Sequence, residues 1–156
     1  MPTPTLNEKA PEFSILDQEG RMHTLKDYAG KYVLLYFYPK DMTPGCTIEA
    51  LQFRDYLKEF VKLNTQILGV SVDPCDSHMQ FARKHQLNFP LLADTEHRVV
   101  DAYGVWNQKS MFGKKYMGIT RESFLIDPKG VIIKHYAKVE PRTHAKDVIN
   151  DVKKLS

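Results

Sequence analysis

Two cysteines, Cys46 and Cys75, are the residues of this chain best suited to covalent chemistry. A thiol reacts as its thiolate, and the pattern around Cys46 predicts a helix N-terminus, where backbone N–H groups and the helix dipole favour an anion. Gly45 allows a close backbone approach, Pro44 stiffens the turn, and Thr43 adds a hydroxyl for a small oxygen ligand. The simpler alternative is that Cys46 is a small buried apolar residue and Cys75 an incidental helix-start residue.

A strand before Cys46 and a helix after it must hold this turn in place. Residues 31–38 form a continuous β-branched and aromatic run, which is typical of a central strand covered on both faces and parallel to its neighbours. After a loop over 39–45, four apolar residues recur at helical spacing and predict one amphipathic helix: Phe53, Leu57, Phe60 and Val61.

The rest of the chain alternates between strand and helix patterns. Strands are predicted over 66–72 and 89–93, helices over 76–86, 96–103 and 143–155, and hairpins over 13–25 and 123–137. This order predicts a mixed α/β fold, with the final helix packed over the sheet. At 156 residues, the chain has the size of one compact domain, 1–156.

Composition excludes several classes of function. The formal charge of +3 is small and its basic residues are scattered among acids, so we expect no nucleic-acid partner. The longest apolar stretch, 32–38, is too short to span a membrane, and the start of the chain lacks a secretory signal. We therefore expect a cytoplasmic protein with no membrane partner, in which both cysteines rest as thiols.

The sequence around Cys46 contains the motif of a known family. Residues 38–47 read YPKDMTPGCT and place Pro39, Thr43 and Cys46 in the pattern Pro, three residues, Thr, two residues, Cys. Other matching segments span nearly the whole chain: APEFSILDQEG, GVSVDP, FPLLAD, AYGVW and YMGITRESFLIDPKG. The chain resembles peroxiredoxins of the bacterioferritin-comigratory, or Q, group.

This resemblance implies a fold and an activity. The fold would be a thioredoxin-like mixed sheet flanked by helices, with an N-terminal β-hairpin extension. The activity would be that of a thiol-specific peroxidase in antioxidant defence and redox homeostasis, which reduces hydrogen peroxide and organic hydroperoxides through a cysteine sulfenic acid and needs no metal, haem or flavin.

The resemblance also assigns site residues. Cys46 would attack the peroxide, Thr43 would hydrogen-bond it and Pro39 would shield the pocket. Arg121 would stabilise the thiolate and the transition state, in keeping with the affinity of a guanidinium for developing negative charge, and Glu49 would orient it. Without the resemblance, Arg121 could equally be an unpaired surface arginine. Glu49 could be an acid that the helix dipole favours in the first turn.

The second half of the cycle stays open. Many members of this group carry a resolving cysteine five residues after the first, but Leu51 occupies that position here. Cys75 is the only intramolecular substitute, and a disulfide, which needs Cα atoms within about 7 Å, would require local unwinding around Cys46. Otherwise thioredoxin, glutaredoxin or glutathione would attack the sulfenic acid directly.

Other functions lack their motifs. The chain has no Cys-x-x-Cys pair, no Gly-x-Gly-x-x-Gly turn and no phosphate-binding loop. Its six histidines lie far apart, so we expect no metal site and take each histidine for a surface or capping residue. The main competitor is a redox sensor or holdase, which would consume about one peroxide per chain rather than many.

Two further expectations concern surfaces. Several aromatic residues around the active-site loop are candidates for an apolar collar that accepts organic hydroperoxides, although several of them are expected to be core: Tyr36, Phe37, Tyr38, Trp106, Phe112 and Tyr116. The chain carries no long tail after Leu155 for resolution across a dimer, so we expect a monomer or a weak homodimer.

Overall fold

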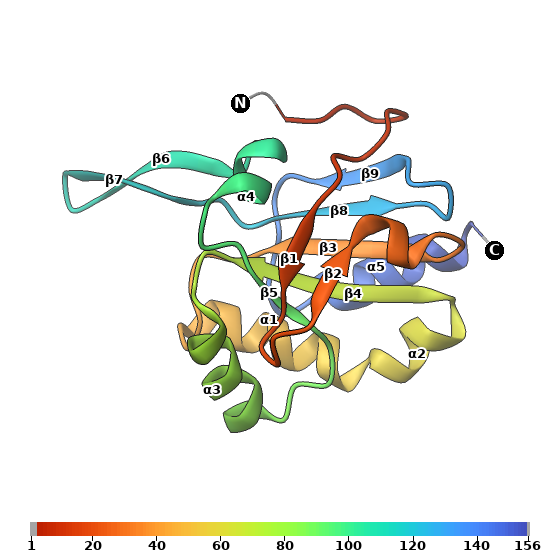
Figure 1. The fold of residues 1–156 in the computed structure, drawn as a ribbon, viewed down its shortest axis with the longest axis horizontal. Coiled ribbons are helices and arrows are strands. Elements are labelled where there is room, and N and C mark those ends of the chain that lie inside the picture. Colours follow the sequence, from red (N-terminus) through yellow and green to blue (C-terminus); the bar gives the residue numbers. More distant parts are fainter. Residues whose placement is uncertain (1–2, 156) are drawn as a thin grey trace.

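A five-stranded mixed sheet forms the centre of the computed structural model, which describes residues 3–155 (Figure 1). Its strands follow the order β5 (Leu91–Ala93), β4 (Thr65–Ser71), β3 (Tyr32–Phe37), β8 (Glu122–Ile126) and β9 (Ile132–Tyr136). Strand β3 is parallel to β4 but antiparallel to β8. The prediction that β3 is parallel to its neighbours is therefore wrong for β8. An apolar run shows that both faces of a strand are covered, but it does not determine the direction of the neighbouring strands.

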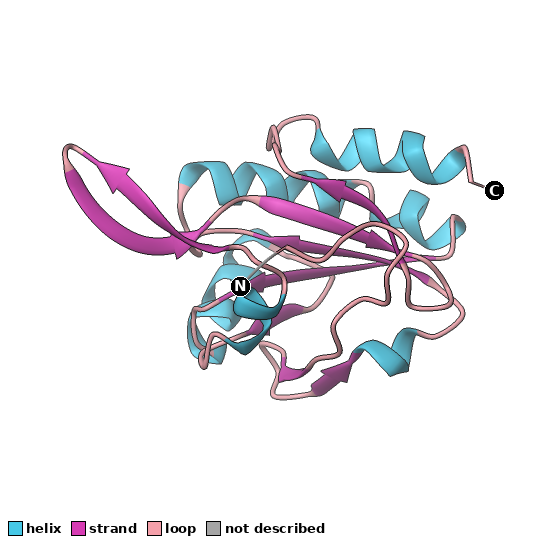
Figure 2. Ribbon diagram, turned by 90° about the horizontal axis from the view of Figure 1, so that it is seen from above, coloured by secondary structure: helices cyan, strands magenta, loops and turns pink. Residues whose placement is uncertain are grey.

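Side chains alternate along β3 and supply two separate cores. Leu34 and Tyr36 point into one core, while Leu35 and Phe37 point into the other. The first core is covered by α1 (Pro44–Asp55), α2 (Leu57–Lys62), α3 (Cys75–His85) and α5 (His144–Lys153). The second is covered by the N-terminal segment and α4 (Arg98–Ala102), as Figures 1 and 2 show. The predicted mixed α/β fold is confirmed.

The helix predicted after Cys46 is interrupted. Tyr56 ends α1 with φ −97° and ψ 7°, and α2 begins at the next residue. Phe53 and Phe60 are buried as predicted, but Val61 is 65% exposed, because the interruption rotates α2 relative to α1. Leu155 is exposed as well, since α5 ends before it. Among residues 3–155, no helix is long and apolar enough to cross a bilayer.

Both predicted hairpins are present, and a third was missed. The predicted ones are β1 (Ser14–Leu16) with β2 (Met22–Thr24), followed by the short helix η1 (Leu25–Tyr28), and β8 with β9. The third, β6 (Trp106–Met111) with β7 (Lys114–Ile119), projects away from the sheet (Figures 1 and 2). Its turn has φ 52° at Phe112 and φ 79° at Gly113, a backbone shape usually announced by Asn-Gly or Gly-Gly.

Candidate active site

Cys46 lies in the first turn of α1, where helix amides lack intrahelical partners. The first backbone hydrogen bond of the helix runs from the amide of Thr47 to the carbonyl oxygen of Thr43, at 2.9 Å. The Thr43 side chain does not cap the helix. The amides of Gly45 and Cys46 are therefore available to an anion or a polar ligand. The thiol itself is only 1% exposed and packs beside Ala50.

Arg121 directly precedes β8 and lies against this turn. Its Nη2 is 3.5 Å from Cys46 Sγ, and its Nη1 donates to Glu49 Oε1 at 2.8 Å. A Cβ atom on Gly45 would lie 3.0 Å from Nη2, so the glycine gives the guanidinium its close approach. The structure thus brings Cys46, Glu49 and Arg121 together, although 75 residues separate the cysteine from the arginine.

The buried ion pair sets the electrostatics of the site. Burial raises the pKa of Glu49 to about 7, and Arg121 opposes that rise. Burial also disfavours the charged guanidinium, but Glu49 and Cys46 together raise the pKa of Arg121 above its ordinary value. Near neutral pH, Glu49 is therefore partly protonated, while Arg121 keeps its positive charge beside the sulfur.

A pocket of about 580 Å³ lies beside Cys46. It is larger than the pocket of about 290 Å³ near the N-terminal segment. Pro39, Thr43 and Arg121 line this pocket, and Val72 and Ile119 are among its apolar residues. The Thr43 hydroxyl donates to the carbonyl oxygen of Lys40 at 2.7 Å, which leaves its own oxygen free to accept a hydrogen bond. The pocket can hold a small polar head and an apolar tail.

Comparison with known proteins identifies the family. Residues 6–135 match the model of the AhpC/TSA family. Peroxiredoxin Bcp of Bacillus subtilis is 46% identical over 151 residues, covering 97% of this chain and 96% of the relative. Peroxiredoxin Bcp of Escherichia coli K12 is 45% identical over 144 residues, covering 92% of each chain. The chain belongs to the peroxiredoxins of the Bcp, or Q, group. It is thus a thiol peroxidase.

Solved structures support the same assignment. The bacterioferritin comigratory protein of Xanthomonas campestris superposes with a TM-score of 0.87 at 38% identity, covering 92% of this chain and 91% of the other. A PrxQ mutant of Xylella fastidiosa superposes with a TM-score of 0.89 at 35% identity, covering 98% and 95%. The predicted thioredoxin-like fold of this peroxiredoxin is confirmed.

The aromatic collar of the peroxiredoxin is smaller than the sequence suggested. Trp106 and Tyr116 line the pocket beside Cys46. Three others are core residues: Tyr36, Phe37 and Tyr38. Phe112 lies at the tip of the β6–β7 hairpin and is 97% exposed.

Lys109 is a pocket residue that the sequence did not reveal. It lines the same pocket, and its Nζ donates to the carbonyl oxygen of Ile119 at 2.7 Å. Burial and the neighbouring Arg121 lower the pKa of Lys109, while Cys46 opposes the change. No motif marks this position, because the lysine reaches the pocket only through the pairing of β6 with β7.

Cys75 lies in a different setting from Cys46. It is the first residue of α3, is half-buried and lines a separate pocket of about 240 Å³ with Leu16, Met22 and Arg98. Both cysteines are free thiols. The structure therefore does not bring the two thiols into one pocket, and a bond between them requires the chain to rearrange.

A buried hydrogen-bond cluster ties the active-site loop to α3. Asp41, in the loop, accepts from the Tyr38 hydroxyl at 2.6 Å and from Ser77 at 2.8 Å, and its Oδ2 is 2.7 Å from His78 Nδ1. The other ring nitrogen of His78 lies 3.0 Å from the carbonyl oxygen of Leu92. The two ring nitrogens of His78 thus connect the active-site loop with the segment that contains Leu92.

Asp73 extends this cluster. Its Oδ2 accepts from the Asp41 amide at 2.9 Å and from the Ser71 hydroxyl at 2.7 Å. Ligand atoms of Asp41, Asp73 and His78 lie within 4.8 Å of one another, a spacing that a metal site would also have. Since hydrogen bonds within the protein already engage these atoms, we interpret the cluster as a clamp that fixes the loop.

Replacing His78 by leucine tests this clamp. The change leaves the buried Asp41 side chain without the ring nitrogen that lies 2.7 Å from its Oδ2, so we expect the free energy of unfolding at pH 7 to fall by about 3 kcal/mol. Urea denaturation gives this value. The added substitution Asp41→Asn should recover part of the loss, since a neutral amide costs less to bury than a carboxylate that has lost a hydrogen-bond partner. A double variant no more stable than His78→Leu would show that the loss does not come from the contact between His78 and Asp41.

Two histidines contradict the expectation of surface or capping positions. His78 is fully buried, and His144 is 2% exposed, with Nε2 2.7 Å from the Ser123 hydroxyl. Burial lowers the pKa of His144 to about 4, so this ring is neutral at physiological pH. Both residues serve as polar elements of the core, a role that sequence spacing cannot distinguish from exposure.

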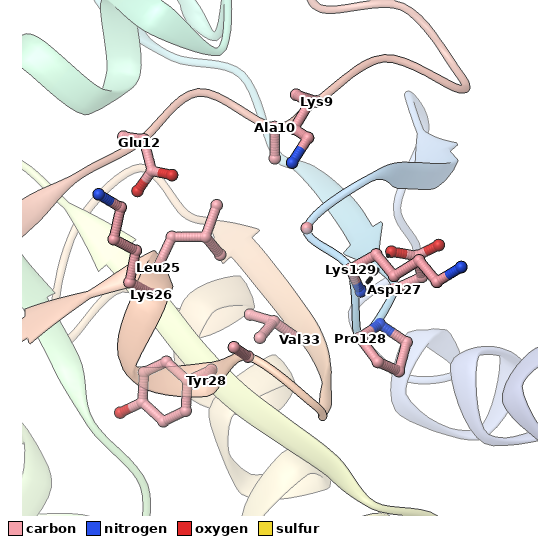
Figure 3. A pocket seen from close by; sticks show the side chains of 12 residues that line it. Lys9, Ala10, Glu12, Leu25, Lys26, Tyr28, Val33, Asp127, Pro128 and Lys129 are labelled. Atoms are coloured by element: carbon pink, nitrogen blue, oxygen red, sulfur yellow. Dashed lines mark hydrogen bonds between the residues drawn. The ribbon is translucent and has the colours of Figure 1, made fainter.

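The pocket of about 290 Å³ lies between the N-terminal segment, η1 and the turn from β8 to β9 (Figure 3). Lysines stand around it, among them Lys9, Lys26 and Lys129. The carboxylate of Asp127 accepts from the amides of Lys129 and Val131 at 2.9 Å each, which fixes the predicted turn. The residues that line this pocket include no cysteine, so it has no place in thiol chemistry.

Proposed function

We propose that the Cys46 thiolate reduces hydrogen peroxide and organic hydroperoxides. The sulfur attacks one peroxide oxygen, an S–O bond forms and the O–O bond breaks, so that Cys46 becomes a sulfenic acid. The departing oxygen takes up a proton and leaves as water or an alcohol. This stoichiometry requires no metal, haem or flavin.

In this proposal, neighbouring groups stabilise charge on sulfur and oxygen. Arg121 and the first amides of α1 face the position where negative charge is held by the thiolate and then develops on the departing oxygen. Thr43 accepts a hydrogen bond from the peroxide, and Pro39 shields the pocket from water. Glu49 orients Arg121 through their 2.8 Å contact.

One observation carries the proposal: a guanidinium lies within 3.5 Å of a buried cysteine sulfur at a helix N-terminus. This arrangement stabilises a thiolate where the pocket admits a small ligand. The apolar walls suit organic hydroperoxides as well as hydrogen peroxide. Consistently, the similar Xanthomonas campestris protein is described by its alkyl peroxide reduction activity.

The sulfenic acid is returned to the thiol by a thioredoxin-type or other thiol reductant. In one route, Cys75 condenses with the sulfenic acid, water is lost, and the reductant cleaves the disulfide. In the other, glutaredoxin, glutathione or thioredoxin attacks Cys46 directly. The direct route is favoured because Cys75 lines a pocket separate from the one formed by Gly45 and Arg121 beside Cys46. We expect the enzyme to act in the cytoplasm as a monomer or weak homodimer.

Mass spectrometry after one equivalent of peroxide tests both the nucleophile and the route. We expect dimedone to label Cys46 as the sulfenic acid, with Cys75 left as a free thiol, and the Cys75→Ser variant to behave in the same way. Loss of two hydrogens with Cys46 linked to Cys75 would establish the two-cysteine route instead. Labelling of Cys75 alone would overturn the assignment of Cys46.

A further inference from the structure

The β6–β7 hairpin exposes apolar side chains far from any core. Phe112 at its tip is 97% exposed, and its neighbour Met111 is 56% exposed. Met117 on the returning strand is 50% exposed. The hairpin projects beyond the body of the protein (Figures 1 and 2), and each of these groups keeps half or more of its surface exposed. Phe112 and Met111 are neighbours at the tip, and exposed apolar groups side by side mark contact surfaces.

The charge of the hairpin is as unusual as its exposure. Residues 106–119 contain three lysines and no acid, a formal charge of +3 that equals the charge of the whole chain. Lys114 pairs with Met111, and Lys115 pairs with Ser110 on the opposite face, so exposed lysines flank Phe112 on both sides of the ribbon. An apolar tip flanked by lysines is complementary to a lipid surface, which has an apolar interior and anionic head groups.

The pocket beside Cys46 extends along this hairpin. Met111, Tyr116 and Met117 belong both to the hairpin and to the lining of the pocket. The charged residues of the lining are cations: Lys40, Lys109 and Arg121. An apolar surface with one sign of charge therefore runs from the hairpin tip to the catalytic pocket.

From these observations, we propose that the β6–β7 hairpin docks on an anionic phospholipid surface, with Phe112 inserted among the acyl chains and Lys114 and Lys115 on the phosphates. The site then faces the membrane interface and can take lipid hydroperoxides from it. This use of the site rests on the proposed function, whereas the docking itself does not. The sequence analysis expected no membrane partner because the chain lacks a span, but a surface contact needs none.

A second copy of the chain fits this surface less well. Two hairpins packed together would bring two sets of three lysines against each other, with no acid on either hairpin to compensate them. Anionic lipid supplies that compensation directly, at a stabilising effect of about 1 kcal/mol for each lysine near the surface.

Co-sedimentation with vesicles tests the docking. We expect the full chain to bind phosphatidylglycerol vesicles at low salt, to leave them as salt rises, and to ignore phosphatidylcholine vesicles. Phe112→Ser should weaken binding about tenfold, because an aromatic side chain is no longer buried. Lys114→Gln with Lys115→Gln should weaken it by about tenfold or more.

Matched variants on α2 provide the control. Val61 is 65% exposed and Lys58 and Lys62 are exposed, so Val61→Ser and Lys58→Gln with Lys62→Gln make the same chemical changes away from the hairpin. These variants should bind as the wild type does. The proposal is overturned if the wild type stays in solution with phosphatidylglycerol, or if Phe112→Ser binds no more weakly than Val61→Ser.

A kinetic comparison separates docking from catalysis. Phe112→Ser should reduce phospholipid hydroperoxide in phosphatidylglycerol vesicles about tenfold more slowly than the wild type, yet reduce soluble cumene hydroperoxide at an unchanged rate. If Phe112→Ser reduces the phospholipid hydroperoxide as fast as the wild type does, docking makes no contribution to turnover. If the wild type reduces neither hydroperoxide, the proposed function fails while the vesicle-binding result stands on its own.

Discussion

Replacing Cys46 by serine is expected to abolish peroxide turnover. Serine keeps the size of the side chain and the first turn of α1, but its hydroxyl does not ionise at physiological pH and is a poor nucleophile toward an O–O bond. Peroxide consumption with excess dithiothreitol should fall by at least about four orders of magnitude. A ferric-xylenol orange assay of residual peroxide gives the rate.

Cys75→Ser is the matched control, because it removes the other thiol by the same chemical change. This variant should consume the first equivalent of peroxide as fast as the wild type, since Cys75 lines a different pocket from that beside Cys46. Continued turnover by Cys46→Ser, lost on the further change of Cys75, would show that Cys75 is the attacking residue.

Much of the fold could be predicted because its signals are local. The run over 31–38 indicated β3, and the apolar spacing after Cys46 indicated α1. The helix begins two residues earlier than predicted, at Pro44, because proline at the first helical position needs no amide partner. Both hairpin turns with aspartate first and glycine last were recognisable, since the turn geometry requires those residues. In each case, a few neighbouring residues determine the backbone shape.

The elements that were missed depend on contacts remote in sequence. The β6–β7 hairpin has exposed and lysine-rich strands, so it lacks the apolar alternation that marks a half-buried strand. Val61 fits a single helical face, but the interruption at Tyr56 turns it to solvent. His78 is buried because Asp41 and Leu92 meet its ring from two other segments. Spacing along the chain contains none of this information.

The same limit applies to the candidate site. The helix start at Cys46 followed from local pattern, whereas the place of Arg121 followed only from family resemblance. The structure supplies the physical reason: Phe37 pairs with Glu122, so Arg121 precedes β8 at the edge of the sheet where β3 ends and α1 begins. A register between antiparallel strands thus brings the guanidinium to the sulfur.

Replacing Arg121 by glutamine should be the second most damaging change to activity. The amide lacks the positive charge that lies 3.5 Å from Cys46 Sγ, so both the thiolate and the departing oxygen lose stabilisation. We expect kcat/KM for hydrogen peroxide to fall about 10²- to 10³-fold. Arg142→Gln, a change at an exposed arginine, is the control and should leave the rate within about twofold.

The same substitution should make stability depend more steeply on pH. The folded pKa of Glu49, about 7, exceeds its ordinary value of 4.5, so Glu49 contributes stability below pH 4.5 that is lost as pH rises through 7. Arg121 limits that loss by pairing with the carboxylate. Without it, we expect the free energy of unfolding to fall by about 3 kcal/mol at pH 8, and by much less at pH 5, where Glu49 is already protonated.

The double variant Arg121→Gln with Glu49→Gln separates the two roles of this pair. Two neutral amides leave no charge buried at the site, so urea unfolding at pH 8 should show most of the stability recovered and a flatter pH dependence. The activity should stay as low as in Arg121→Gln alone, because the cation beside the sulfur is still absent. Recovery of activity together with stability would mean that Arg121 acts by holding the fold rather than by stabilising charge at Cys46.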